Sequence, residues 1–203
     1  MPRFSHAMQC IAACAVFAGA NAYSDTGKLL LTGGVSSIDG AAGGGISPWA
    51  LVGTQATQGE WGASAYATRL RTQDYALSGA GAALAWNDRL ELSVARQSLD
   101  TGPTGAALGL PGLHLKQTIL GAKLRIAGDA VLDSDTWVPQ IAVGVLHKTL
   151  DSSGLNTTLQ ALGAERDGTE VYVSAAKLFL AQGLLLNGTL RATNANQNGL
   201  LGF

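Results

Sequence analysis

The chain has 203 residues, of which 47% are hydrophobic and 13% charged, with 27 glycines and a formal net charge of -1. This length suffices for one sizeable domain, and the near-neutral charge argues against nucleic acid as a partner. Charged residues are about half as frequent as the roughly 25% usual in soluble domains, yet no apolar run reaches the roughly 20 residues of a spanning helix. Apolar content that is high but dispersed is typical of transmembrane strands.

Residues 1–22 have the form of a cleaved signal peptide: Arg3, an apolar core over 11–20, and the small-x-small triplet Ala20-Asn21-Ala22. Both cysteines lie in this segment, so no disulfide is expected in the mature chain. A lipoprotein cleavage site at Cys14 is the alternative, but apolar residues continue beyond it where the core should already have ended. We therefore expect export, and a mature domain over residues 23–203.

The mature chain begins with a predicted strand over 28–35 (KLLLTGGV), a flexible exposed loop over 36–46 and a second strand over 48–57. The glycines in the loop lack the Gly-Lys-Ser/Thr sequence that follows in a phosphate-binding loop. Three more strands follow over 61–71, 75–86 and 89–99, with a tight turn at Asn87-Asp88. In the last of these, apolar and polar side chains alternate, as in a strand with two different faces.

After a long connection over 100–112, residues 113–149 read as two long antiparallel strands. Leu120, Leu124 and Val143 mark the apolar side of this hairpin. Its connection, 128–136, contains three aspartates, but without the spacing of a calcium loop we expect a solvated acidic turn: Asp129, Asp133 and Asp135.

The remaining chain has a second long connection over 151–168, with a helical turn expected within 155–164, and two strands over 170–180 and 184–193. In total we expect about nine strands plus a stub over 194–203. No amphipathic helix is long enough to cover a sheet.

Connection lengths favour a barrel over a soluble sandwich. Three of four connections at one end of the strands are long, and three of four at the other end are tight, which is the asymmetry of outer-membrane barrels. The four tryptophans also lie at or near predicted strand ends, where the headgroup levels of a bilayer would be: Trp49, Trp61, Trp86 and Trp137. We predict an all-β, antiparallel up-and-down transmembrane β-barrel. A soluble periplasmic β-rich binding protein is the alternative.

Four segments carry a resemblance: residues 28–45 (KLLLTGGVSSIDGAAGGG), 88–97 (DRLELSVARQ), 121–135 (GAKLRIAGDAVLDSD) and 170–203. Together they resemble a proteobacterial domain family of unknown function. The resemblance implies an exported, barrel-like protein without an established activity. It also implies that family members continue beyond the equivalent of Phe203, so that the last strands of the barrel are missing here.

Eight polar side chains are predicted to point inward and are our lumen-lining candidates: Glu91, Lys123, Arg125, Gln140, Lys148, Asn187, Thr189 and Arg191. We expect Glu91 and Arg125 to be close neighbours. An unpaired excess of Lys and Arg would favour anionic solutes, whereas paired charges would close the lumen. A passive small-solute pore and a membrane-structural component with a packed interior both remain open.

His114 and His147, together with Asp151, Ser152 and Ser153, suggest an alternative rim-located lipid-modifying enzyme. Both histidines share strand parity with apolar residues, so we expect polar rim positions and no catalytic residues. We expect no cofactor and no metal. The expected partners are outer-membrane lipid and the barrel assembly machinery, in the cell outer membrane, with the oligomeric state open.

Overall fold

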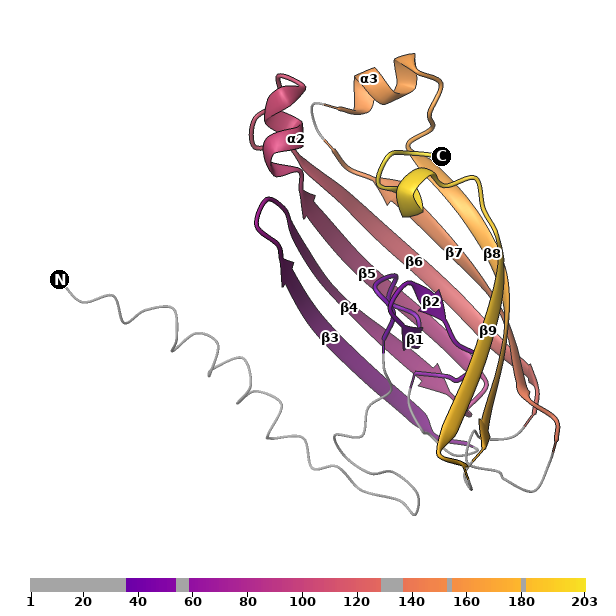
Figure 1. Ribbon diagram of the computed structural model, residues 1–203. Helices are drawn as coiled ribbons and strands as arrows, with labels where there is room; N and C mark the ends of the chain where they lie inside the picture. Colours follow the sequence, from indigo (N-terminus) through magenta and orange to yellow (C-terminus); the bar gives the residue numbers. More distant parts are fainter. Residues whose placement is uncertain (1–35, 54–58, 129–136, 153–154, 180–181) are drawn as a thin grey trace.

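The computed structural model describes residues 36–53, 59–128, 137–152, 155–179 and 182–203 (Figure 1). Seven antiparallel strands form one sheet in chain order, each paired with its sequence neighbours. The sheet curls into a half-barrel, with the first and last strands as its two edges. Its strands are β3 (Trp61–Arg71), β4 (Ala76–Trp86), β5 (Leu90–Asp100), β6 (His114–Ala127), β7 (Gln140–Leu150), β8 (Asp167–Phe179) and β9 (Leu184–Ala192).

The antiparallel, up-and-down part of the fold prediction is confirmed. The described residues do not form a closed barrel, and their main sheet has seven strands rather than about nine. The predicted strand over 28–35 lies outside the described residues. The strand predicted over 48–57 is wrong for residues 48–53, which join no strand of the main sheet.

Alternation gives the sheet two different faces. In β5, Glu91 and the residues two and four further on are buried, whereas Leu92 and Val94 between them are exposed. The register preserves this separation across strands, because Glu91 lies opposite Lys123 and Leu92 opposite Ala122. The buried charged side chains therefore lie on the concave side of the curl, together with an apolar cluster that includes Ile119, Leu146 and Tyr172, and most exposed Leu and Val side chains lie on the convex side.

The connections differ between the two ends of the sheet. We call one end the turn rim; there β4 joins β5 through Asn87 and Asp88, whose φ values of 55° and 50° fit the tight turn predicted at this dipeptide. The opposite end, the helix rim, carries α2 (Gly102–Ala107) and α3 (Asn156–Ala161) in its two long connections (Figure 1). The helical turn expected within 155–164 is confirmed by α3.

Residues 36–53, which we call the plug, lie inside the curl, against the concave face (Figure 1). They include the two-residue strands β1 (Gly43–Gly44) and β2 (Ser47–Pro48), paired antiparallel. Asp39 and Ala42 are almost fully buried, so the prediction of an exposed loop over 36–46 is wrong for most of this segment, although Gly45 and Ile46 at its end are exposed. Small side chains allow this burial: a Cβ atom on Gly40 would lie 2.9 Å from that of Ala95.

The last described residues fold over the helix rim. After β9 the chain forms η3 (Asn196–Gly199), and Phe203 exchanges two backbone hydrogen bonds with Glu165, of 2.8 and 3.0 Å. The Phe203 ring is buried against Gly168 and Gly199. Within the described residues, no helix has the length and apolarity to cross a membrane.

Candidate functional site

All eight inward-pointing candidates lie on strand positions of the concave face. Four of them are buried below 6% exposure: Glu91, Lys123, Gln140 and Lys148. The other four are Arg125, Asn187, Thr189 and Arg191. Most of them contact the plug or one another rather than an open channel.

The first ion pair of this face joins Glu91 to Lys123, with 3.1 Å between Oε1 and Nζ. The Glu91 carboxylate also accepts hydrogen bonds from two plug amides, Ala42 N–H at 2.9 Å and Gly53 N–H at 2.5 Å. The Lys123 ammonium donates to two plug carbonyls, of Ala42 at 3.0 Å and Leu51 at 2.7 Å. Adjacent strands thus hold the plug backbone through both its donors and its acceptors.

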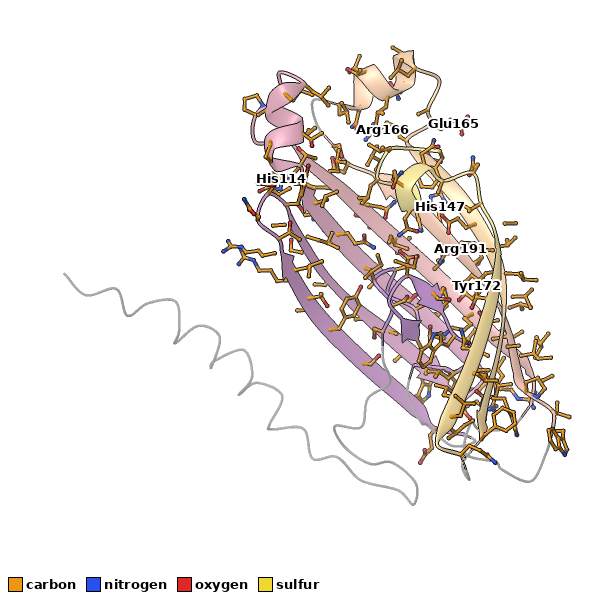
Figure 2. All side chains as sticks on the ribbon, in the orientation of Figure 1. His114, His147, Glu165, Arg166, Tyr172 and Arg191 are labelled. Carbon is orange, nitrogen blue, oxygen red and sulfur yellow. The ribbon has the colours of Figure 1, made fainter. Side chains whose placement is uncertain are left out.

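The second ionic group lies across β7, β8 and β9. The Lys148 Nζ atom is 3.2 Å from Asp39 of the plug and 3.2 Å from Glu170. Arg191, which is labelled in Figure 2, lies 3.1 and 3.3 Å from the same two carboxylates. Asn198, beyond β9, accepts a hydrogen bond of 2.7 Å from Lys148 and donates one of 3.0 Å to Asp39.

The charges of these two groups cancel. Three acids, Asp39, Glu91 and Glu170, face three bases, Lys123, Lys148 and Arg191. The unpaired cationic excess that would favour anionic solutes is therefore absent from this group. Ion pairs removed from water are stable only when hydrogen bonds satisfy their remaining donors and acceptors, and here the plug supplies several of them.

Uncharged groups extend these contacts across the sheet. The plug accepts hydrogen bonds from Tyr66 of β3 at 2.9 Å and from Gln97 of β5 at 2.7 Å, both at the Ile38 carbonyl. At its other end, Ser174 of β8 and Thr189 of β9 donate to the Pro48 carbonyl at 2.9 and 2.6 Å. Side chains of six of the seven strands therefore bond the plug, β4 being the exception among the described contacts.

Arg125, the predicted neighbour of Glu91, instead pairs with Asp88 in the turn between β4 and β5, at 3.1 Å. The register sets Lys123 opposite Glu91 and Arg125 two positions further along β6, so Arg125 lies near Glu91 on the same face without being its ion-pair partner. Burial raises the pKa of Asp88 above its usual range, and the nearby Arg125 opposes this shift.

Two ionic residues escaped the sequence analysis. Glu170 shares strand parity with Tyr172 and Ser174, so the alternation that found the other candidates could have found it. Asp39 lies in a glycine-rich segment without alternation, and only the folded plug brings it to Lys148.

The two histidines are exposed and separate. The register places His114 opposite Asp100 and His147 opposite Leu120, six positions further along β6, or roughly 20 Å at the usual rise per residue (Figure 2). The Ser152 hydroxyl accepts a hydrogen bond of 3.1 Å from the backbone N–H of Lys116, and Ser153 lies outside the described residues. These groups form no catalytic constellation in the described structure.

Metal-ligand geometry is likewise not found. The described residues contain no group of three or more His, Cys, Asp or Glu side chains able to hold a metal ion. The three aspartates expected in an acidic turn, Asp129, Asp133 and Asp135, lie outside the described ranges.

The convex side is the second distinctive surface. Large apolar side chains of β4 to β9 are exposed there, and ten of them make up what we call the convex apolar face: Leu84, Leu92, Val94, Leu120, Leu124, Val145, Val171, Val173, Leu186 and Leu190. The face is hollowed between β5 and β9 by a groove of about 750 Å³, whose lining includes Leu90 and Val143. Monomeric soluble proteins rarely expose contiguous apolar areas of this kind.

Aromatic rings border this face at the turn rim. Trp61 and Trp86 end the paired strands β3 and β4, with ring centroids 6.0 Å apart. Trp137, which is 88% exposed, lies 6.5 Å from Phe179 of β8. Trp49 does not share this position, because it lies in the plug, where it follows the two-residue strand β2 and packs beside Gly44.

Fold and site together define an antiparallel half-barrel protein whose concave side is filled by its own preceding segment. The chain belongs to the family described as "Protein of unknown function (DUF3034)", whose model matches residues 32–203. No curated protein and no solved structure matches the chain.

Proposed function

We propose that this chain is an exported outer-membrane protein of the β-barrel type, whose convex apolar face lies against lipid hydrocarbon. The observation that carries the proposal is the reversal of the usual arrangement: buried ion pairs inside the curl and exposed Leu and Val side chains outside it. Transmembrane strands alternate in this sense because lipid, unlike water, accepts apolar side chains and rejects charges.

The rims support the same proposal. Tryptophan rings gather at bilayer interfaces, and Trp61, Trp86 and Trp137 border the apolar face at the turn rim. Toward the helix rim the convex side becomes polar, with Arg96, Lys116 and Thr149 exposed on β5, β6 and β7. Two of the three connections at the turn rim are short, and two of the three at the helix rim are long, an asymmetry in the sense that is typical of outer-membrane barrels.

We further propose a membrane-structural role with a closed interior rather than a passive pore. The plug occupies the space through which solute would pass, and each charge of the two ionic groups has a partner within 3.3 Å. The proposal includes no catalytic step and no cofactor. In lipid the open edges of β3 and β9 would leave backbone groups unpaired, so it requires that further strands cover them.

Lipid contact is tested by placing a fluorophore at a single introduced cysteine, since the only cysteines of the chain lie in the predicted signal peptide. In vesicles with bromine on the acyl chains, a probe at Val173→Cys should be quenched strongly. A probe at Thr149→Cys, also exposed but near the helix rim, should be quenched much less. Equal, weak quenching at both positions, with the chain recovered in the soluble periplasmic fraction, would refute the proposal.

The closed interior is tested by single-channel recording in planar lipid. The wild-type chain should insert without steady conductance. The double variant Asp39→Asn, Glu91→Gln removes one carboxylate of the plug and one of the sheet, both of which hold the plug in place, and should give transient openings. Steady conductance of the wild type would support a pore instead.

A further inference from the structure

A second pocket lies at the helix rim, over the ends of β3, β4 and β5 and the first residue of β6. It has a volume of about 630 Å³, and its lining is mostly polar. The strand registers place its members in two rows: Arg69, Ser78 and Ser98 form one, and Arg71, Ala76, Asp100 and His114 the other. Figure 2 labels His114 at this end of the sheet, below α2.

The cationic side of the pocket is a pair of arginines. Arg69 and Arg71 are exposed on the same face of β3, about 7 Å apart at the usual rise per residue. No ion pair with another described residue is formed by either one. Guanidinium groups at this spacing can bind the oxygens of one phosphate, which they match with paired N–H donors.

The anionic side of the pocket consists of Asp74 and Asp100. One carboxylate oxygen of Asp100 accepts a hydrogen bond of 3.0 Å from Gly102 N–H. This bond orients the carboxylate and leaves its other oxygen able to accept a hydrogen bond from a ligand. Asp74 lies in the turn between β3 and β4. Across the described ranges, neither aspartate pairs with a cation. The Ser98 hydroxyl, on the same strand as Asp100 and 3.5 Å from His114 Nδ1, adds a further hydrogen-bonding group to the pocket.

We propose that this pocket binds the zwitterionic headgroup of a phosphoethanolamine lipid, with the phosphate on Arg69 and Arg71 and the primary ammonium on Asp74 and Asp100. Two arginines and two aspartates match one phosphate and one ammonium. An anionic headgroup without an ammonium would leave both carboxylates unpaired. A choline headgroup would supply no N–H donor to them.

The surface next to the pocket fits the rest of such a lipid. Toward the turn rim, the convex side of β3 and β4 carries a strip of exposed alanines, which leaves a shallow, apolar track beside Leu92 and Val94: Ala63, Ala65, Ala67, Ala80 and Ala82. An acyl chain can lie on this track while its headgroup occupies the pocket. The inference rests on the proposed function, since it requires that the convex face meets lipid.

The test is electron spin resonance of the full chain in vesicles, with spin-labelled lipids carrying ethanolamine, choline or glycerol headgroups. The ethanolamine lipid should be enriched about threefold next to the protein over the other two, in line with exposed ion pairs. The double variant Arg69→Gln, Arg71→Gln should lose this preference. Lys116→Gln, on the same rim but outside the pocket, should retain it.

A second variant keeps the test decisive if the arginine variant does not fold. Asp74→Asn, Asp100→Asn leaves both arginines and removes the ammonium partners, so its preference should shift from the ethanolamine lipid to the anionic glycerol lipid. Equal enrichment of all three lipids by the wild type, or preference for the glycerol lipid, would overturn the inference. So would displacement of the ethanolamine lipid by inorganic phosphate alone, which would indicate a simple anion site.

The two proposals fail in different ways. If no spin-labelled lipid shows a motionally restricted component, the chain does not meet lipid and the proposed function fails with the inference. If such a component is present but has no headgroup preference, only the inference fails.

Discussion

On the concave face of the sheet, charged side chains such as Glu91 and Lys148 are fully enclosed and paired. On the convex face, on alternate residues of the same strands, side chains such as Leu92 and Val173 are exposed. The alternation of a strand therefore separates two environments across the thickness of one sheet. The concave face therefore packs mainly against the plug, which takes the place that a second layer would have in a soluble domain.

Position also decides what an ion pair contributes. Arg96 and Asp151 approach to 3.7 Å on the surface, where both side chains are more than half exposed. Pairs of this kind contribute little, because water and salt screen them. The enclosed pairs behave differently, since removal of one partner leaves a charge without solvent.

The largest loss of stability is expected when an ion pair enclosed on the concave face loses one partner. Lys148→Ala would leave Asp39 and Glu170 with Arg191 as their remaining cation, and should destabilise the fold by about 3–5 kcal/mol. The measurement is the temperature at which the chain loses its folded gel mobility in detergent. Lys116→Ala, exposed on β6, is the matched control and should change that temperature little. Equal effects of the two variants would mean that the interior pairs are open to water.

The next effect tests the convex face. Val173→Arg places a charge in the middle of β8, where its neighbours in the register are Val143 and Leu190. In a bilayer this should cost about 2–4 kcal/mol, measured by unfolding of the chain from vesicles. Thr149→Arg, near the helix rim, should cost much less. A cost near zero at both positions would mean that the convex face does not lie in lipid.

A smaller effect is expected where the concave face is tightly packed. A Cβ atom at Gly144 would overlap the Tyr172 ring, whereas one at Gly188 would meet no atom within 4 Å. Gly144→Ala should therefore destabilise the fold by about 1–3 kcal/mol, and Gly188→Ala should be nearly neutral. Chemical unfolding of both variants measures this difference, and equal midpoints would contradict the packing described for Tyr172.

The smallest effect concerns pH. The pKa of Asp88 is raised in the folded chain, so the protonated acid favours folding below its ordinary pKa of about 4, and this contribution is lost as pH rises through the raised value. The stability of the wild type relative to Asp88→Asn should accordingly fall over this range, as measured by chemical unfolding at a series of pH values. A difference that rises with pH would show that the Arg125 pair outweighs burial.

Sequence alternation was sufficient for the sheet. It predicted β3 with the bounds found and β4 and β5 within one residue at each end. It also assigned the eight polar candidates to one face, which is the concave face of the sheet, whereas a lumen along this face stays a prediction. These features depend on neighbours along the chain, which a period of two records. The same rule could have included Glu170.

The plug could not be predicted in this way. Its burial depends on partners far along the chain: Asp39 pairs with residues 109 and 152 positions away. Small residues occur both in exposed loops and in buried segments where the backbone packs closely, so the composition of residues 36–46 does not distinguish the two. The pairing of Glu91 with Lys123 likewise depends on the register between β5 and β6, which the predicted strand ends alone do not give.

The number of strands in the sheet also limits how its wall can be completed. Because β3 and β9 are separated by six antiparallel pairings, both run from the turn rim to the helix rim. Joining these two edges directly would create one parallel ladder in an otherwise antiparallel cylinder. An odd number of added strands would instead keep every pairing antiparallel and make the total even, as in bacterial single-chain outer-membrane barrels.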